Sequence, residues 1–175
     1  MNIAFNLKQQ ISGASVVVAL ASAGLTAVPV SVLAQTSNVV KLHCTAVGNN
    51  PPEALGDRPG HSIAISEFTC IEEAGPLDGG VMWGTQIYEW DGVNGVGKAG
   101  FGVIRGRGGQ IVYVNTEMKN TMTMADGKIT GFVATGRGHY PVATGNAASS
   151  AGKTYSYVAK PGPGPGRFVI ESTID

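Results

Sequence analysis

Short segments of alternating apolar and polar residues follow one another along the chain from residue 39 onward. Each is rich in Val, Ile, Thr, Tyr and Phe, which fit the pleated, half-buried surface of a sheet. The segments that we expect to form strands are 39–47, 61–73, 81–90, 99–105, 110–124, 128–137, 153–160 and 167–174. No apolar stripe of helical spacing and comparable length follows Ala34. The pattern predicts an all-β domain of roughly eight strands.

Turn-forming residues separate these segments. Asp126 and Gly127 stand between two strand-like runs, and an Asp-Gly pair in that position is a strong hairpin signal. Residues 161–166 alternate proline and glycine. A proline cannot donate to a strand ladder, so we expect an exposed loop there. Residues 49–60 are predicted to form a second loop.

Eight antiparallel strands with little helix can close as a barrel or pack as a two-sheet sandwich. Closure is favoured because it leaves no exposed strand edge. We therefore predict a single antiparallel eight-stranded β-barrel. The interior of such a barrel is just wide enough to be filled by side chains or to hold one small ligand.

The N-terminal segment has the pattern of a secretory signal. A polar stretch with Lys8 precedes an uncharged run, 11–34, which ends in Val-Leu-Ala and is followed by polar residues. The run is long enough for a retained membrane anchor, but glycines and a proline interrupt it. We expect a signal helix at 1–34, cleavage after Ala34 and a mature domain at 35–175. This predicts an exported protein, periplasmic or extracellular, without a stable membrane span after processing.

The balance of charge limits the partners. The chain has 12 basic and 12 acidic residues, so the predicted mature domain, which lacks Lys8, is close to neutral. A near-neutral domain has no strong field with which to attract nucleic acid or an anionic membrane surface. We expect neither as a partner.

Both cysteines, Cys44 and Cys70, lie in the predicted mature domain, and an exported protein meets an oxidising compartment. A disulfide is the simplest interpretation. It would close a loop of about 26 residues and stabilise the fold by roughly 3 kcal/mol on the chain-entropy argument. A metal-binding pair and a reactive thiol are the alternatives, although no Cys-x-x-Cys spacing supports either.

One motif resembles a known family. A Gly-x-Gly-x-Tyr-x-x-Ala-x-Gly pattern is formed by Gly136, Gly138, Tyr140, Ala143 and Gly145. It resembles the pattern of the allene oxide cyclase and dirigent superfamily of eight-stranded barrels, which includes small bacterial exported members of unknown function. The resemblance implies the barrel fold. It implies no reaction, because the residues with which those cyclases and dirigent proteins handle ligands find no matching positions here.

Candidate acid–base residues are few. Glu67 and Glu89 each follow apolar residues in alternating register, so both could point into the barrel, where burial raises a carboxyl pKa. The alternative is that these faces point outward or that a bulge reverses the register. His139, inside the family-like motif, is the third catalytic candidate. The three histidines have no short ligand spacing, so we expect no metal site, and we expect no cofactor.

The leading hypothesis is that the barrel binds a small apolar or aromatic ligand. The expected lining residues come from alternating strands: Trp83, Ile87, Tyr113, Phe132, Tyr155 and Phe168. One alternative is a cyclase or isomerase in which Glu67 or Glu89 moves protons. Another is a non-enzymatic interaction module such as a homo-oligomer, because both faces of 81–90 are partly apolar. The sequence leaves open whether there is any catalysis.

Overall fold

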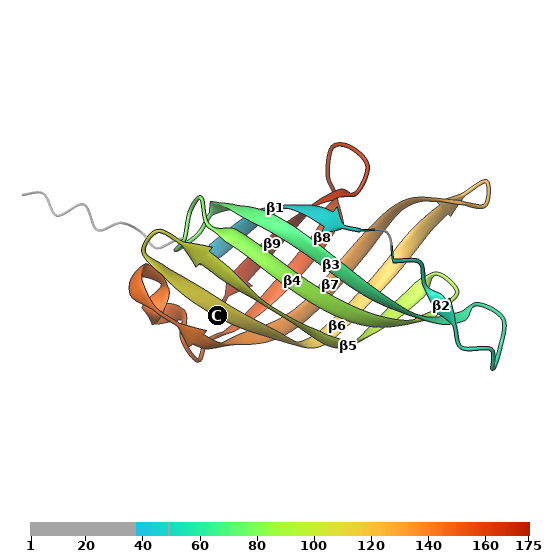
Figure 1. Ribbon diagram of the computed structural model, residues 1–175, viewed down its shortest axis with the longest axis horizontal. Helices are drawn as coiled ribbons and strands as arrows, with labels where there is room; N and C mark the ends of the chain where they lie inside the picture. Colours follow the sequence, from blue (N-terminus) through green and yellow to red (C-terminus); the bar gives the residue numbers. More distant parts are fainter. Residues whose placement is uncertain (1–37, 49) are drawn as a thin grey trace, which may run out of the picture. The chain divides into compact units, whose positions relative to one another are not determined.

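The alternating segments form strands throughout the part of the chain that the computed structural model describes, residues 38–48 and 50–175 (Figure 1). The strands are β1 (Val39–Val47), β2 (Glu53–Ala54), β3 (His61–Ala74), β4 (Val81–Asp91), β5 (Asn94–Gly106), β6 (Gly109–Ala125), β7 (Lys128–Ala143), β8 (Thr154–Pro161) and β9 (Arg167–Ile174). A short 3-10 helix, η1 (Gly145–Ser150), lies between β7 and β8. Each predicted strand is present, β1 and β9 with the predicted bounds. The predicted signal helix and its cleavage site after Ala34 lie outside the described residues.

The strands close into a ring. Their order is β1-β9-β8-β7-β6-β5-β4-β3, each neighbour is antiparallel, and β1 also pairs with β3. The predicted antiparallel eight-stranded β-barrel is therefore confirmed, and the sandwich alternative is wrong. The two-residue strand β2 was not predicted; it lies outside the ring and pairs with the start of β3.

A disulfide joins the two strands β1 and β3. Cys44 and Cys70 are direct partners in the β1–β3 ladder, both are buried, and their sulfur atoms form a disulfide. The predicted pairing is confirmed. The metal-pair and reactive-thiol alternatives are excluded for these cysteines, since neither is free.

The β6–β7 hairpin has the predicted two-residue turn. Asp126 and Gly127 have φ angles of 50° and 73°. A type I′ turn needs positive φ at both central residues, and its twist matches that of the flanking strands. The Asp-Gly signal therefore fixes the turn of this long hairpin.

The inner face of β5 consists largely of glycines, and large side chains from other strands occupy the space beside them. Trp90 lies over Gly95, Met118 lies over Gly97, and Tyr113 lies over Gly102. Side chains at these glycines would collide with the packed interior. The high glycine content therefore serves packing within the barrel as well as turns.

One end of the barrel is filled by apolar side chains, and we call it the closed end. The helix η1 lies against β6 and β7, and the amide of Thr144 donates to the carbonyl of Gln110 at 2.9 Å. Ala147 of η1 and Ile111 of β6 are both 0% exposed, and Leu77 from the β3–β4 turn is buried too. These described residues therefore leave this end of the barrel closely packed.

Candidate functional site

A cavity of about 490 Å³ opens at the end of the barrel opposite η1, beside the β8–β9 loop. Its lining is largely aromatic or apolar, and its aromatic side chains are Phe68, Tyr88, Trp90, Phe132, Tyr157 and Phe168. We call it the mouth cavity. Its volume is within the range that accommodates small organic ligands.

Aromatic contacts hold the wall of the mouth cavity in place. Phe168 packs edge-to-face against Phe68 and Phe132, with ring centroids 5.5 Å and 6.1 Å apart. Tyr88 and Trp90 form a tilted pair at 5.7 Å. Edge-to-face pairs are favourable aromatic arrangements. These rings come from strands β3, β4, β7 and β9, so the wall is formed only when the barrel has closed.

Three polar atoms in this apolar lining have no hydrogen-bond partner among the described residues. They are the hydroxyls of Tyr88 and Tyr157 and the side-chain oxygen Oδ1 of Asn120. Burial raises the pKa of both tyrosines, so they stay neutral over the physiological range. A buried polar atom without a partner costs about 1–3 kcal/mol, so a molecule that supplied partners would gain stability from these contacts.

Among the described residues, two charged side chains line the mouth cavity. Glu67 comes from β3 and Arg167 from the start of β9, and each is at least partly exposed. Their opposite charges leave the lining without net charge. The mouth cavity is therefore neutral as a whole and apolar over most of its surface.

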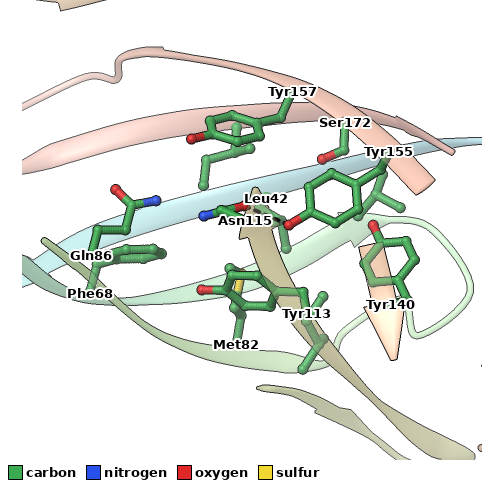
Figure 2. Close-up of a pocket in the computed structure, with 13 residues that line it drawn as sticks. Leu42, Phe68, Met82, Gln86, Tyr113, Asn115, Tyr140, Tyr155, Tyr157 and Ser172 are labelled. Carbon is green, nitrogen blue, oxygen red and sulfur yellow. Dashed lines mark hydrogen bonds between the residues drawn. The ribbon is translucent and has the colours of Figure 1, made fainter. Parts of the chain in front are cut away.

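A second, much smaller space lies deeper in the barrel and shares Phe68, Gln86, Tyr157 and Ile170 with the mouth cavity. Its volume of about 30 Å³ suffices for a water molecule or two. Figure 2 shows polar side chains around it: the Tyr155 hydroxyl donates to Asn115 Oδ1 at 2.6 Å. This deeper space is therefore far smaller than the mouth cavity.

Four of the six predicted lining residues point inward. Phe132 and Phe168 line the mouth cavity, while Tyr113 lines the deeper space together with Tyr155. Their role in binding stays a prediction.

Trp83 and Ile87 were predicted to line the interior, and this placement is wrong. Trp83 is 43% exposed, and Ile87 shares its outward face. The inward face of β4 instead carries Tyr88 and Trp90. Both faces of β4 are apolar, so alternation alone could not tell them apart. The outward apolar residues of β4 are compatible with a homo-oligomer, which stays a prediction.

The three catalytic candidates are not brought together. Glu67 lies at the edge of the mouth cavity. Glu89 was considered as an inward carboxyl with a raised pKa, but it lies on the outer face, and hydrogen bonds from Lys98 and His61 lower its pKa. His139 is half-buried in β7 and lines neither of the two interior spaces. For the cyclase alternative, Glu67 is the candidate carboxyl that borders the cavity.

Within residues 38–48 and 50–175, the carboxyl buried inside the barrel is that of Glu72, which was not predicted. It is 1% exposed, and its Oε1 atom accepts a hydrogen bond from the Leu77 amide at 2.8 Å. Burial raises its pKa. Its signal in the sequence was alternation, because Phe68, Cys70 and Glu72 share one face of β3. Glu72 holds the β3–β4 turn at the closed end and does not line the mouth cavity.

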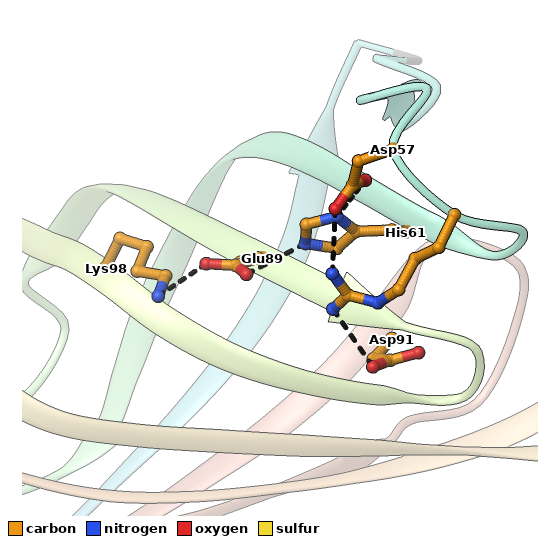
Figure 3. Close-up of polar contacts among 6 residues, drawn as sticks. Asp57, His61, Glu89, Asp91 and Lys98 are labelled. Atoms are coloured by element: carbon orange, nitrogen blue, oxygen red, sulfur yellow. Dashed lines mark hydrogen bonds and ion pairs between the residues drawn. The ribbon is translucent and has the colours of Figure 1, made fainter.

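A polar cluster lies on the outer face near β2 (Figure 3). His61 Nδ1 is 2.5 Å from Asp57 Oδ1, and His61 Nε2 is 2.8 Å from Glu89 Oε1. Lys98 also contacts Glu89, at 2.5 Å. The two carboxylates raise the pKa of His61, and both ring nitrogens donate when it is protonated. With both nitrogens occupied, His61 acts as a clamp that holds the 56–61 segment to β4.

We expect Asp57→Asn to lower the pKa of His61, because a neutral amide replaces a carboxylate that stabilises the imidazolium. The wild-type midpoint should lie above the ordinary value of 6.5. The clamp therefore stabilises the segment fully below pH 6.5, and this contribution is lost as pH rises through the folded-state pKa. An NMR titration of the His61 ring measures both midpoints. An unchanged midpoint in Asp57→Asn would contradict the clamp.

The chain matches no family model, no curated protein and no solved structure. The resemblance to the allene oxide cyclase and dirigent superfamily therefore stays a prediction. Its motif has a local physical explanation: Gly136 and Gly138 make room for the rings of Tyr157 and Tyr155, and Tyr140 stacks on Tyr155 with centroids 4.6 Å apart.

Residues 38–48 and 50–175 contain no group of three or more His, Cys, Asp or Glu side chains placed to bind a metal ion. No helix in this part of the chain has the length and apolar character needed to cross a membrane.

Proposed function

We propose that this protein is an exported binding protein that holds a small apolar or aromatic molecule in the mouth cavity. The observation that carries the proposal is the cavity itself: about 490 Å³ of space at the open end of the barrel, against about 30 Å³ in the deeper space. Binding sites for small molecules are typically concave, mostly apolar and equipped with a few polar groups.

The composition of the wall supports an apolar ligand. Phe68, Phe132 and Phe168 present aromatic surface to the cavity, and their mutual contacts fix its shape before a ligand arrives. A preformed wall reduces the entropy cost of binding. Apolar surface removed from water contributes roughly 25 cal/mol per Å².

The disulfide supports the proposed location. Cys44 and Cys70 are paired, and disulfides persist in oxidising compartments such as the periplasm and the extracellular space. Together with the predicted signal at 1–34, this favours export.

A cavity-filling substitution tests the proposal. Ala134 is buried in the wall of the mouth cavity, so Ala134→Leu would place a larger side chain inside the cavity. With the neutral apolar dye N-phenyl-1-naphthylamine as probe, we expect the variant to bind at least about tenfold more weakly, or about 1.4 kcal/mol. Fluorescence titration measures the affinity, and circular dichroism checks that the variant folds.

The matched control is Thr135→Leu. Thr135 is the next residue of β7 and is exposed on the outer face, so the same leucine is added outside the barrel. Its affinity for the dye should stay within about twofold of the wild type. The proposal fails if the wild type does not bind the dye, or if both leucine variants lose the same affinity.

A further inference from the structure

The polar atoms of the mouth cavity indicate which charge and hydrogen-bonding groups a ligand needs at the end that enters first. Tyr88 from β4 and Tyr157 from β8 are 3% and 6% exposed, and both line the cavity. Their hydroxyls lie close to each other, and this contact affects the pKa of both, although neither hydroxyl makes a hydrogen bond of normal geometry. Asn120 Oδ1 from β6 is the third buried polar atom of this lining without a partner among the described residues. Tyr88, Tyr157 and Asn120 thus lie on three separate strands, and each adds a residue with an unpaired oxygen atom to the lining of one cavity.

The charge of the lining disfavours an ionised ligand. The charged residues that line the cavity are Glu67 and Arg167, which carry opposite charges, and both are at least partly exposed. Tyr88 and Tyr157 are neutral. A carboxylate or an ammonium group that reached the three oxygens would lose its hydration without gaining a countercharge. The group that binds there must therefore be neutral.

The hydrogen-bonding capacity of the three atoms limits the neutral head groups that fit. Asn120 Oδ1 can only accept a hydrogen bond, whereas a tyrosine hydroxyl can donate and accept. A ketone or an ester only accepts, so it would leave Asn120 Oδ1 without a partner. A hydroxyl group donates one bond and accepts others, so it can serve the asparagine and a tyrosine together.

We propose that the ligand of the mouth cavity is an uncharged apolar molecule with a hydroxyl group that enters first and bonds to Asn120, Tyr88 and Tyr157. This inference rests on the proposed function and specifies which kind of ligand the mouth cavity binds. The apolar body of the ligand lies against the phenylalanine wall. The structure therefore assigns these three residues as the specificity determinants of the cavity.

A series of eight-carbon compounds tests the proposal, because its members share an apolar body and differ in the head group. 1-Octanol, 2-octanone, octanoate and octylammonium compete with N-phenyl-1-naphthylamine for the full mature protein. We expect octanol to displace the dye at about fivefold lower concentration than octanone, the effect of one additional hydrogen bond. We expect octanoate and octylammonium to be weaker than octanol.

Tyr157→Phe removes one hydroxyl and keeps the ring. It should shrink the preference for octanol over octanone, and Tyr140→Phe is the matched control, because Tyr140 lines the deeper space and not the mouth cavity. In the control the preference should remain about fivefold. The measured quantity is the ratio of the octanone and octanol concentrations that displace the dye from one protein. A general loss of stability affects both concentrations and leaves this ratio unchanged.

The outcomes separate this inference from the proposed function. If the dye does not bind at all, the proposed function fails. If the dye binds and the four compounds compete equally, or octanoate or octylammonium is the strongest, the cavity binds ligands but the hydroxyl proposal is overturned. A preference for octanol that survives Tyr157→Phe unchanged also overturns the assigned role of Tyr157.

Discussion

Replacing Cys44 and Cys70 together by alanine is expected to lower the free energy of unfolding by about 3 kcal/mol. The disulfide joins β1 to β3 across a sequence separation of 26 residues, so it restricts the unfolded chain. Both cysteines are buried in the core, and the loss of their sulfur atoms also weakens packing. Urea unfolding followed by tryptophan fluorescence measures the difference.

The wild-type protein under reducing conditions is the companion measurement. Reductant should destabilise the wild type and leave the double alanine variant unchanged, since the variant has no disulfide to reduce. The expected role of the bond would be contradicted if the oxidised wild type and the variant unfolded at the same urea concentration.

Gly136→Ala is expected to destabilise the barrel by about 3 kcal/mol or to prevent folding. A methyl group at this position would collide with the backbone carbonyl of Glu117 and with the ring of Tyr157. The tyrosine could turn away, but the carbonyl belongs to the neighbouring strand β6 and cannot move without disturbing the ladder. Thermal or urea unfolding measures the effect.

Gly131→Ala is the control on the same strand. A methyl group there would make ordinary contacts, with Pro161 at 3.8 Å and Thr123 at 3.9 Å as its nearest neighbours. Alanine restricts the unfolded chain more than glycine does, so the variant should be as stable as the wild type or up to about 1 kcal/mol more stable. Equal destabilisation at both positions would show that close packing at Gly136 is not the cause.

Strands and turns were predictable because their signals are local. The period-two alternation, the β-branched residues and the Asp126-Gly127 pair depend on neighbours in the sequence. Barrel closure followed from the number of strands and the cost of exposed edges. The 3-10 helix η1 was missed because it is short and has no amphipathic repeat.

It was harder to predict which face of each strand points into the barrel. In β4 both faces are apolar, so Trp83 and Trp90 look alike in the sequence although only Trp90 lines the cavity. The predicted disulfide could have identified the inner face of β3, because a disulfide is normally buried. Glu72 lies on the same face as Cys70 and is therefore inside the barrel. The three unpaired oxygens come from three different strands, and no local pattern brings them together.

The ring has a consequence for the order in which the chain folds. Every pairing in the ring except β1–β9 joins strands that follow each other closely in the sequence, whereas β1–β9 joins the two ends of the described chain. Distant pairings form slowly because they cost loop-closure entropy before they contribute contacts. An open sheet with β1 and β9 as its edges would therefore form first, and the disulfide between β1 and β3 can form in it. Until those edges meet, the aromatic interior and two unpaired strand edges are exposed to other chains, which makes ring closure the step most vulnerable to aggregation.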